Sequence, residues 1–376
     1  MFDILLPAGF SFAITFFTIP VIINIAKQKK LFDIPDERKI HTSQIAPLGG
    51  VAIFAGVVLS TLVALTFSQA TEFQYFIAAA LVIFFLGLKD DILVISPLKK
   101  LVGQVLAASL IIHKGGIQLK SLHGFLGLQE LPEGMGLLLT YFTIIIIINA
   151  FNLIDGVDGL AGSLGLMVAL IFGSYFFAIG LMPYAILSFS LASALAAFLI
   201  FNFQPARIFM GDSGSLLVGM ISAILAVKFI NVAPGNAVMP LTSSPALGFS
   251  ILLIPLLDTL RVFGIRVLNG KSPFYPDRNH IHHILLNKNL SHQSITLIIV
   301  CTSLLFVGIA YSALSLGNTG LTILLTGLFF VSIAMLTKIR RPKRLVVTKV
   351  TKRNTLKIVS SPKIVTLTEE TALEEK

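Results

Sequence analysis

The sequence has little charge. Of its 376 residues only 12% are charged, whereas 55% are hydrophobic and the mean hydropathy is +0.91. A soluble globular domain carries about 25% charged residues, so this chain has too few polar side chains to cover a water-exposed surface. Apolar runs of about 17 or more residues recur along most of the chain, and each can cross a bilayer as a helix. The composition excludes a soluble domain and predicts an all-α, polytopic integral membrane protein.

The sequence also has little cysteine and no positively charged residue near its N-terminus. Cys301 is the one cysteine and lies within an apolar run, so disulfide bonds have no role. No Lys or Arg precedes Lys27, which excludes the positive n-region of a cleavable signal peptide and favours a retained first helix. The chain also lacks an internal repeat of fixed period, which argues against the inverted-repeat transporter folds.

Eleven apolar segments are predicted to cross the membrane, which puts the two termini on opposite sides. Of the 28 Lys and Arg residues, 25 then fall on one side, and only Lys114, Lys120 and Lys228 lie on or near the other. Positive residues favour the cytoplasmic side, so we expect the N-terminus outside and the C-terminus in the cytoplasm. The predicted spans are residues 4–26, 48–69, 73–90, 100–113, 136–152, 160–180, 183–202, 213–231, 245–267, 295–316 and 319–337.

The organisation is that of one membrane domain with a short appendage. Residues 1–337 form the predicted transmembrane domain, and residues 338–376 form a basic cytoplasmic tail that we expect to be largely disordered. The Gly-rich outer segment 114–135 is compatible with a small hairpin or an interfacial helix. The net charge of +10 reflects topology and contact with anionic lipid rather than nucleic-acid binding, since the basic residues do not gather in a soluble domain.

Carboxylates gather at the predicted cytoplasmic ends of the helices. The seven are Asp90, Asp91, Asp155, Asp158, Asp212, Asp258 and Asp277. Ionisable groups at membrane depth are costly and usually functional, so this clustering suggests one shared site. Asp90 and Asp91 lie just before Lys99 and Lys100, which could neutralise the pair or hold a phosphate. The pair by itself is equally compatible with a solvated helix end.

The segment NAFNLIDGVDGLAGSLG is a more specific signal of a functional site than the Asp90 and Asp91 pair. Asn149 and Asn152 are three residues apart and so share a helix face, and Asp155 and Asp158 repeat that spacing. The glycines that follow at every third residue permit a close backbone approach to a ligand or a neighbouring helix. Tight helix packing with two Asp caps would explain the glycines but not both pairs of polar residues, so a functional site is favoured.

Two further segments carry polar groups. Asp212, in FMGDSGS, precedes a span and is either an ordinary helix cap or a carboxylate suited to Mg²⁺ beside a helix N-terminus. His280, His282 and His283 follow Arg278 in PDRNHIHH. This tract lacks the cysteines of a zinc site and fits a phosphate-binding rim better. Asp258 and Arg261 are interpreted as a structural ion pair.

The order DD, NAFNLIDGVDGLAG, FMGDSGS and PDRNHIHH resembles that of the polyprenyl-phosphate N-acetylhexosamine-1-phosphate transferases, over roughly residues 1–337. The likeness is strongest to the WecA/TagO type, and the His-x-His-His form points away from the MraY type. The resemblance implies Mg²⁺, or Mn²⁺ in its place, on Asp212 and Asn152. It implies catalytic roles for Asp90, Asp91 and Lys100. The substrate-binding residues that we expect are Asn149, Asp155, Asp158, Arg278, His280, His282 and His283.

The function implied is transfer of an N-acetylhexosamine-1-phosphate, with GlcNAc expected, from a UDP-sugar to undecaprenyl phosphate at the cytoplasmic face of the bacterial inner membrane. UMP would be released, the product would start a lipid-linked glycan such as lipopolysaccharide or a wall polymer, and a homodimer is left open. The alternative is an ion-coupled membrane transporter, which predicts charges near the midplane rather than at one face. The CDP-alcohol phosphotransferases are excluded, because Gly162 and Ser163 rather than an Arg follow Ala161.

Overall fold

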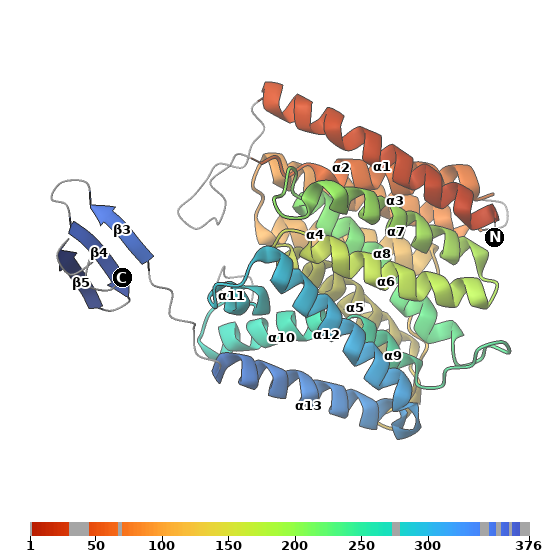
Figure 1. The fold of residues 1–376 in the computed structure, drawn as a ribbon. Helices are drawn as coiled ribbons and strands as arrows, with labels where there is room; N and C mark the ends of the chain where they lie inside the picture. Colours follow the sequence, from red (N-terminus) through yellow and green to blue (C-terminus); the bar gives the residue numbers. More distant parts are fainter. Residues whose placement is uncertain are drawn as a thin grey trace.

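The computed structural model describes residues 2–29, 45–66, 70–272, 279–338, 346–350, 355–360 and 363–368. Its helices lie alongside one another as a bundle (Figure 1). They are α1 (Phe2–Lys29), α2 (Gly49–Ala64), α3 (Glu72–Ile92), α4 (Pro97–Ser109), α5 (Glu133–Ile154), α6 (Leu160–Ala178), α7 (Met182–Asn202), α8 (Gly211–Val232), α9 (Ser244–Ile251), α10 (Leu253–Leu268), α11 (Ile281–Leu286), α12 (His292–Ser312) and α13 (Gly317–Lys338). A π-helical turn, η1 (Leu110–Lys114), extends α4, and a 3₁₀ turn, η2 (Leu314–Leu316), precedes α13.

Each of the eleven predicted spans overlaps a helix of the bundle. Within the described ranges, seven helical segments are long and apolar enough to cross a membrane. They comprise α1, α5, α6, α7, α8, α12 and the segment Leu314–Lys338. The prediction of a polytopic helical membrane protein is thereby confirmed. The number of eleven crossings and the orientation of the termini stay predictions.

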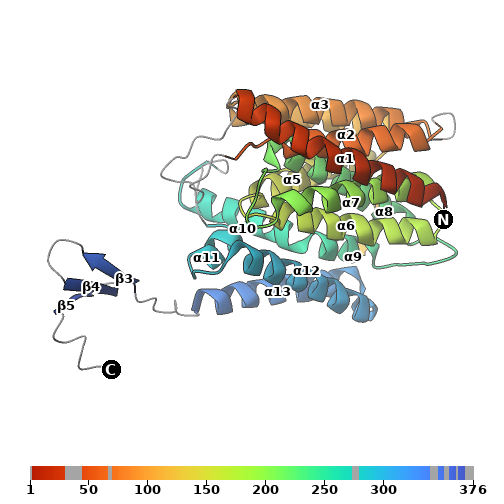
Figure 2. The same cartoon turned by 45° about the horizontal axis from the view of Figure 1, so that its top comes forward.

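Helix α8 forms the centre of the bundle. In its most apolar stretch 78% of the residues are buried, against 22% in α1 and in α13, which lie on opposite flanks (Figure 2). Glycines let the neighbouring helices come close: a Cβ on Gly219 would lie 2.7 Å from the Cα of Ile148 in α5, and a Cβ on Gly87 of α3 would lie 2.5 Å from the backbone of Ser213. Such close approach is typical of packing between membrane helices. It fixes α3 and α5 against α8, which carries Asp212 in its first turn.

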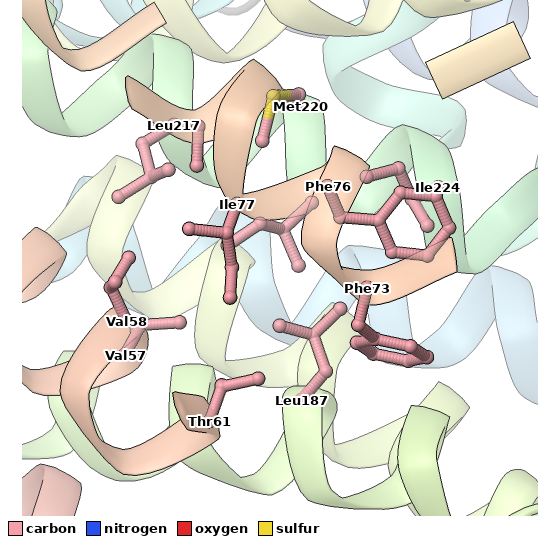
Figure 3. Close-up of a pocket in the computed structure, with 12 residues that line it drawn as sticks. Val57, Val58, Thr61, Phe73, Phe76, Ile77, Leu187, Leu217, Met220 and Ile224 are labelled. Carbon is pink, nitrogen blue, oxygen red and sulfur yellow. The ribbon is translucent and has the colours of Figure 1, made fainter. Parts of the chain in front are cut away.

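A small apolar pocket lies between α2, α3, α7 and α8 (Figure 3). Thr61 contributes the only hydroxyl to its lining, and its Oγ1 has no hydrogen-bond partner among the described residues. The adjacent Ser60 differs, because its hydroxyl donates to Ser190 Oγ at 2.6 Å. The other lining residues are Val57, Val58, Phe73, Phe76, Ile77, Ala80, Leu187, Leu217, Met220, Ile221 and Ile224.

The predicted span 245–267 is interrupted. It consists of α9 and α10, which are separated at Leu252, where the backbone leaves helical geometry at φ −105° and ψ 8°. Pro255 lies in the first turn of α10, where its missing N–H is tolerated. Helix α10 begins anew there and carries Asp258 toward the segment that contains His280.

Strands occur at two places in the part of the chain that the structure describes. In the outer segment, β1 (Ser121–Phe125) pairs antiparallel with β2 (Leu128–Glu130), so of the two forms considered the hairpin is confirmed. In the tail, β3 (Val346–Val350), β4 (Thr355–Ser360) and β5 (Lys363–Thr368) form an antiparallel sheet in the order β3-β4-β5. The Val, Ile and Thr content of these segments favours strands, and the expectation of disorder for the tail as a whole stays a prediction.

Candidate active site

The N-terminus of α8 is capped by a carboxylate from another helix. Asp91, in the last turn of α3, accepts hydrogen bonds from the backbone N–H groups of Asp212 at 2.7 Å and Ser213 at 3.1 Å. Gly211 makes room for it, since its φ of +71° favours glycine and a Cβ there would lie 2.7 Å from both Asp91 oxygens. Both oxygens of Asp91 are therefore engaged in positioning α8.

Asp212 is the point at which four helices meet. Its Oδ2 lies 2.5 Å from Lys100 Nζ of α4, and its Oδ1 accepts a hydrogen bond at 2.9 Å from the side-chain amide of Asn152 in α5. Lys100 also pairs with Asp90 of α3, at 2.6 Å. The structure thus brings together Asp90, Asp91, Lys100, Asn152 and Asp212, as the sequence predicted.

Asn149 lies one turn deeper in α5 and faces a different neighbour. Its amide group donates to Gln104 Oε1 at 2.8 Å and to the Ile145 carbonyl at 2.8 Å, while Gln104 Nε2 donates back at 3.4 Å. Its hydrogen-bonding groups are thus occupied within the bundle. The substrate-binding role predicted for Asn149 stays a prediction that this geometry does not favour.

The segment that follows α5 links the Asp212 cluster to the histidines. Asp155 ends α5, and burial raises the pKa of its carboxyl to about 8, with the carboxylates of Asp212, Asp91 and Asp158 adding to the shift. The next residue, Gly156, lies against His282: a Cβ there would be 2.6 Å from His282 Nε2. Asp155 therefore lies between the Asp212 cluster and the histidines, where one bound ligand could contact both.

Asp158 contacts helix α12. It is 5% exposed, and its carboxylate lies 3.3 Å from His292 Nδ1 at the start of α12. Its backbone carbonyl accepts a hydrogen bond from Thr296 at 3.0 Å. On the other side, Gly159 N–H donates to Asn202 Oδ1 at 2.8 Å. Asp158 thus connects the loop to α12, and its predicted place in the substrate pocket stays a prediction that this geometry does not favour.

Asp258 organises the histidine segment. The Nδ1 of His280 lies 2.8 Å from its Oδ2, Arg261 donates to its Oδ1 at 2.8 Å, and the Ile281 backbone N–H also donates to it. The predicted ion pair with Arg261 is therefore present, but Asp258 does more than pair with it. Sequence reasoning missed this role, although a carboxylate at membrane depth was an available signal.

The two buried histidines of the tract stack. The rings of His280 and His282 are 5.7 Å apart and nearly parallel, with an interplanar angle of 5°. Burial lowers the pKa of His282 to about 3, and positive charge on His283 and His280 adds to the shift, so His282 is a neutral imidazole at physiological pH. Arg278 and Asp277 lie outside the described residues.

The Asp212 cluster offers only part of a magnesium site, which bound substrate would have to complete. No group of three His, Cys, Asp or Glu side chains that could hold a metal ion occurs in the part of the chain that the structure describes. Mg²⁺ commonly binds through one or two carboxylates together with substrate phosphates, and Asp212 supplies one carboxylate. The amide of Asn152 would offer its oxygen after a rotation that exchanges its O and N positions.

Comparison with known proteins identifies the family. Residues 73–230 match the family model described as glycosyl transferase family 4. The chain is 35% identical to a decaprenyl-phosphate N-acetylglucosaminephosphotransferase of Mycobacterium tuberculosis (strain CDC 1551 / Oshkosh), over 80% of both chains. It is 32% identical to an undecaprenyl-phosphate alpha-N-acetylglucosaminyl 1-phosphate transferase of Yersinia pestis, over 79% of this chain and 80% of the relative. The corresponding probable transferase of Bacillus subtilis (strain 168) is 33% identical, over 76% and 78%. The chain therefore belongs to the family of polyprenyl-phosphate N-acetylglucosamine-1-phosphate transferases.

Proposed function

We propose that this protein transfers N-acetylglucosamine-1-phosphate from UDP-N-acetylglucosamine to undecaprenyl phosphate and releases UMP. The observation that carries the proposal is the Asp212 carboxylate at the start of α8, which Lys100 and Asn152 contact from two other helices. The names of the relatives support N-acetylglucosamine as the sugar and a polyprenyl phosphate as the acceptor. The product would begin a lipid-linked glycan of the cell envelope.

The reaction is a single displacement at phosphorus. An oxygen of the lipid phosphate forms a bond to the phosphorus that carries the sugar, and the bond from that phosphorus to the bridging oxygen breaks, so that UMP leaves with the bridging oxygen. Most of the catalysis in such a transfer is alignment and charge neutralisation. Lys100 supplies a cation, and its contact with Asp90 and Asp212 holds it where two phosphates would meet.

Direct attack is favoured over a covalent Asp–phosphate intermediate. Asp91 uses both carboxylate oxygens to cap α8, and Asp90 accepts a hydrogen bond from the Ile95 N–H at 2.7 Å as well as pairing with Lys100. Neither carboxylate is poised as a free nucleophile. Mg²⁺ held by Asp212 and Asn152, with Mn²⁺ as a substitute, would neutralise the donor pyrophosphate. His280, His282, His283 and Arg278 would bind that pyrophosphate and the sugar.

The site is expected to face the cytoplasm of a bacterial inner membrane. The excess of Lys and Arg on the same side as the carboxylates supports this orientation. A soluble UDP-sugar and a phosphate at headgroup depth can meet there without moving charge across hydrocarbon. Eleven crossings, with the N-terminus outside, complete the proposed topology, and a homodimer stays a prediction.

The test uses purified protein in detergent, with undecaprenyl phosphate, Mg²⁺ and a panel of UDP-sugars, and follows UMP and the lipid-linked product. We expect UMP release with UDP-N-acetylglucosamine that depends on the lipid and stops with EDTA. Asp212→Ala should lower kcat at least 100-fold, on the order expected when a main electrostatic group is lost. The control Glu133→Gln, an exposed carboxylate at the other end of α5, should retain activity. Full turnover by Asp212→Ala would refute the metal assignment, and no UMP from any donor would refute the reaction.

A further inference from the structure

We propose that Gln104 is a positioning residue, whose amide pair with Asn149 sets the register of α4 against α5 and so aligns Lys100 and Asn152 on Asp212. The inference rests on the proposed function, because it assigns a role in shaping the same metal and phosphate site. Gln104 itself lies too deep in the bundle to be offered as a substrate ligand. It is only 1% exposed.

The pair is a reciprocal one. Asn149 Nδ2 donates to Gln104 Oε1 at 2.8 Å, and Gln104 Nε2 donates to Asn149 Oδ1 at 3.4 Å. Burying an amide without hydrogen-bond partners inside a membrane protein costs free energy. Two amides on neighbouring helices avoid that cost only when the helices are positioned so that the amides meet. A slide of one helix by a single residue, about 1.5 Å, would break both hydrogen bonds. The pair therefore has the properties of a register lock.

Helix α4 has one further polar contact with α5 among the described residues, between Ser109 Oγ and Tyr141 Oη at 2.8 Å. Its buried residues are Gln104, Ala107 and Ala108, and the two alanines offer no directional contact. Leu98, Val102 and Leu106 are 54–70% exposed, so one face of α4 turns away from the bundle. Ser109 is only partly buried, so Gln104 is the fully buried polar residue of α4 that can specify where the helix lies along α5.

The lock lies one turn from the site on both helices. Lys100 precedes Gln104 by four residues and Asn152 follows Asn149 by three, so each polar residue shares a helix face with its partner in the lock. The distances along the two axes are about 6 Å and about 4.5 Å. Lys100 and Asn152 contact the two different oxygens of Asp212, at 2.5 Å and 2.9 Å. A shift of α4 would move Lys100 off Oδ2 while leaving α5 and α8 packed.

The test compares variants that remove the lock with one that rebuilds it. Gln104→Met keeps the length of the side chain and Asn149→Leu keeps its bulk, and neither retains the amide. The double variant Gln104→Asn/Asn149→Gln exchanges the two amides and keeps the summed length of the side chains. Thr140→Val on α5 is the matched control, because it removes a buried hydroxyl that bonds Leu119 N–H and the Gly136 carbonyl at the far end of that helix.

Two measurements are made on each variant: Mn²⁺ binding without substrates, by electron paramagnetic resonance, and kcat as a function of Mg²⁺ concentration. We expect Gln104→Met and Asn149→Leu each to tighten Mn²⁺ binding about tenfold, because Lys100 leaves the Asp212 carboxylate and no longer repels the cation there. They should also lower kcat about tenfold or more, because the Lys100 cation that neutralises the phosphates is misplaced. Combining the two should add little, and the exchanged pair should return binding to within about threefold of the wild-type value. Thr140→Val should lower the melting temperature and leave Mn²⁺ binding unchanged.

The outcomes separate this inference from the function. Mn²⁺ binding and kcat in Gln104→Met that match Thr140→Val would overturn the positioning role and leave the proposed function standing. If Gln104→Met does not fold, Asn149→Leu and the exchanged pair decide by the same criteria. A wild-type protein that neither binds Mn²⁺ nor releases UMP would overturn the proposed function, and this inference with it.

Discussion

Asp258 carries a negative charge into a buried position and is surrounded there by donors. It is 1% exposed and is contacted by His280, Arg261 and the backbone of Ile281. Because Nδ1 of His280 is held by this carboxylate, Nε2 is the nitrogen left to meet a ligand, and it has no hydrogen-bond partner among the described residues. Asp258 thus selects both the orientation and the tautomer of His280.

Replacing Asp258 with Asn should impair both stability and activity. The amide cannot accept from all three donors, and it leaves Arg261 without its counter-charge. Breaking a buried pair in this way costs about 3 kcal/mol, which should appear as a lower melting temperature in detergent. We expect kcat/KM for the UDP-sugar to fall at least about tenfold. Unchanged values of both quantities would contradict the organising role of Asp258.

The raised pKa of Asp155 leads us to expect that the stability of the protein depends on pH. This pKa rises from 3.8 to about 8 on folding, so between these values the folded protein binds a proton that the unfolded chain does not. The contribution of Asp155 to the free energy of unfolding is therefore full at low pH and is lost as the pH rises toward 8. Asp155→Asn does not titrate, so its melting temperature in EDTA should exceed that of the wild type more at pH 9 than at pH 5. A difference that is the same at both pH values would contradict this assignment.

At the residue scale the sequence located the cluster of polar residues, and the roles of its members stay predictions. Asp212, Asn152 and Lys100 meet as the motifs predicted. Asn149 shares a helix face with Asn152, but a helical repeat does not tell which neighbour each residue meets at its own depth, and Asn149 meets Gln104. The neighbour of Asp158 could not be predicted either, because His292 comes from a helix that is distant in sequence.

At the scale of elements, the hydrophobic pattern predicted where helices occur but not where they break. Each predicted span overlaps a helix, since about 20 apolar residues specify one well. The break at Leu252 was not predicted, because the residues on both sides of it are equally apolar. The packing of α2, α3, α7 and α8 against one another also could not be predicted from the sequence, since it depends on side-chain shape.

The pocket between these four helices yields a stability prediction. Thr61→Val keeps the shape of the side chain and removes a buried hydroxyl that has no partner among the described residues. It should stabilise the protein by about 1 kcal/mol, measured as a higher melting temperature in detergent. The neighbouring Ser60→Ala is the matched control with the opposite sign, because it removes the hydrogen bond to Ser190. A lower melting temperature for Thr61→Val would indicate that its hydroxyl has a partner.

At the scale of the whole molecule, the two ends of the bundle differ in chemistry. Helix α5 has 22 residues and is therefore about 33 Å long, which is enough to separate the two surfaces of a bilayer. Asp155 and the Asp212 cluster lie at its C-terminal end, and the β1–β2 hairpin precedes its N-terminal end. The sequence puts most Lys and Arg residues in loops predicted to lie on the same side as the site, so the positive-inside rule predicts that this end faces the cytoplasm.

Cysteine labelling tests this orientation directly. Cys301 is the single cysteine, so Cys301→Ser gives a background without thiols. In that background Asn287→Cys places a thiol at the exposed end of α11, and Glu130→Cys places one at the exposed end of the hairpin. With a membrane-impermeant maleimide, Asn287→Cys should react in inside-out vesicles and Glu130→Cys in right-side-out vesicles. The reverse pattern would put the site outside, away from cytoplasmic UDP-sugars, whereas labelling of both residues from one side would show that α5 does not separate the two surfaces.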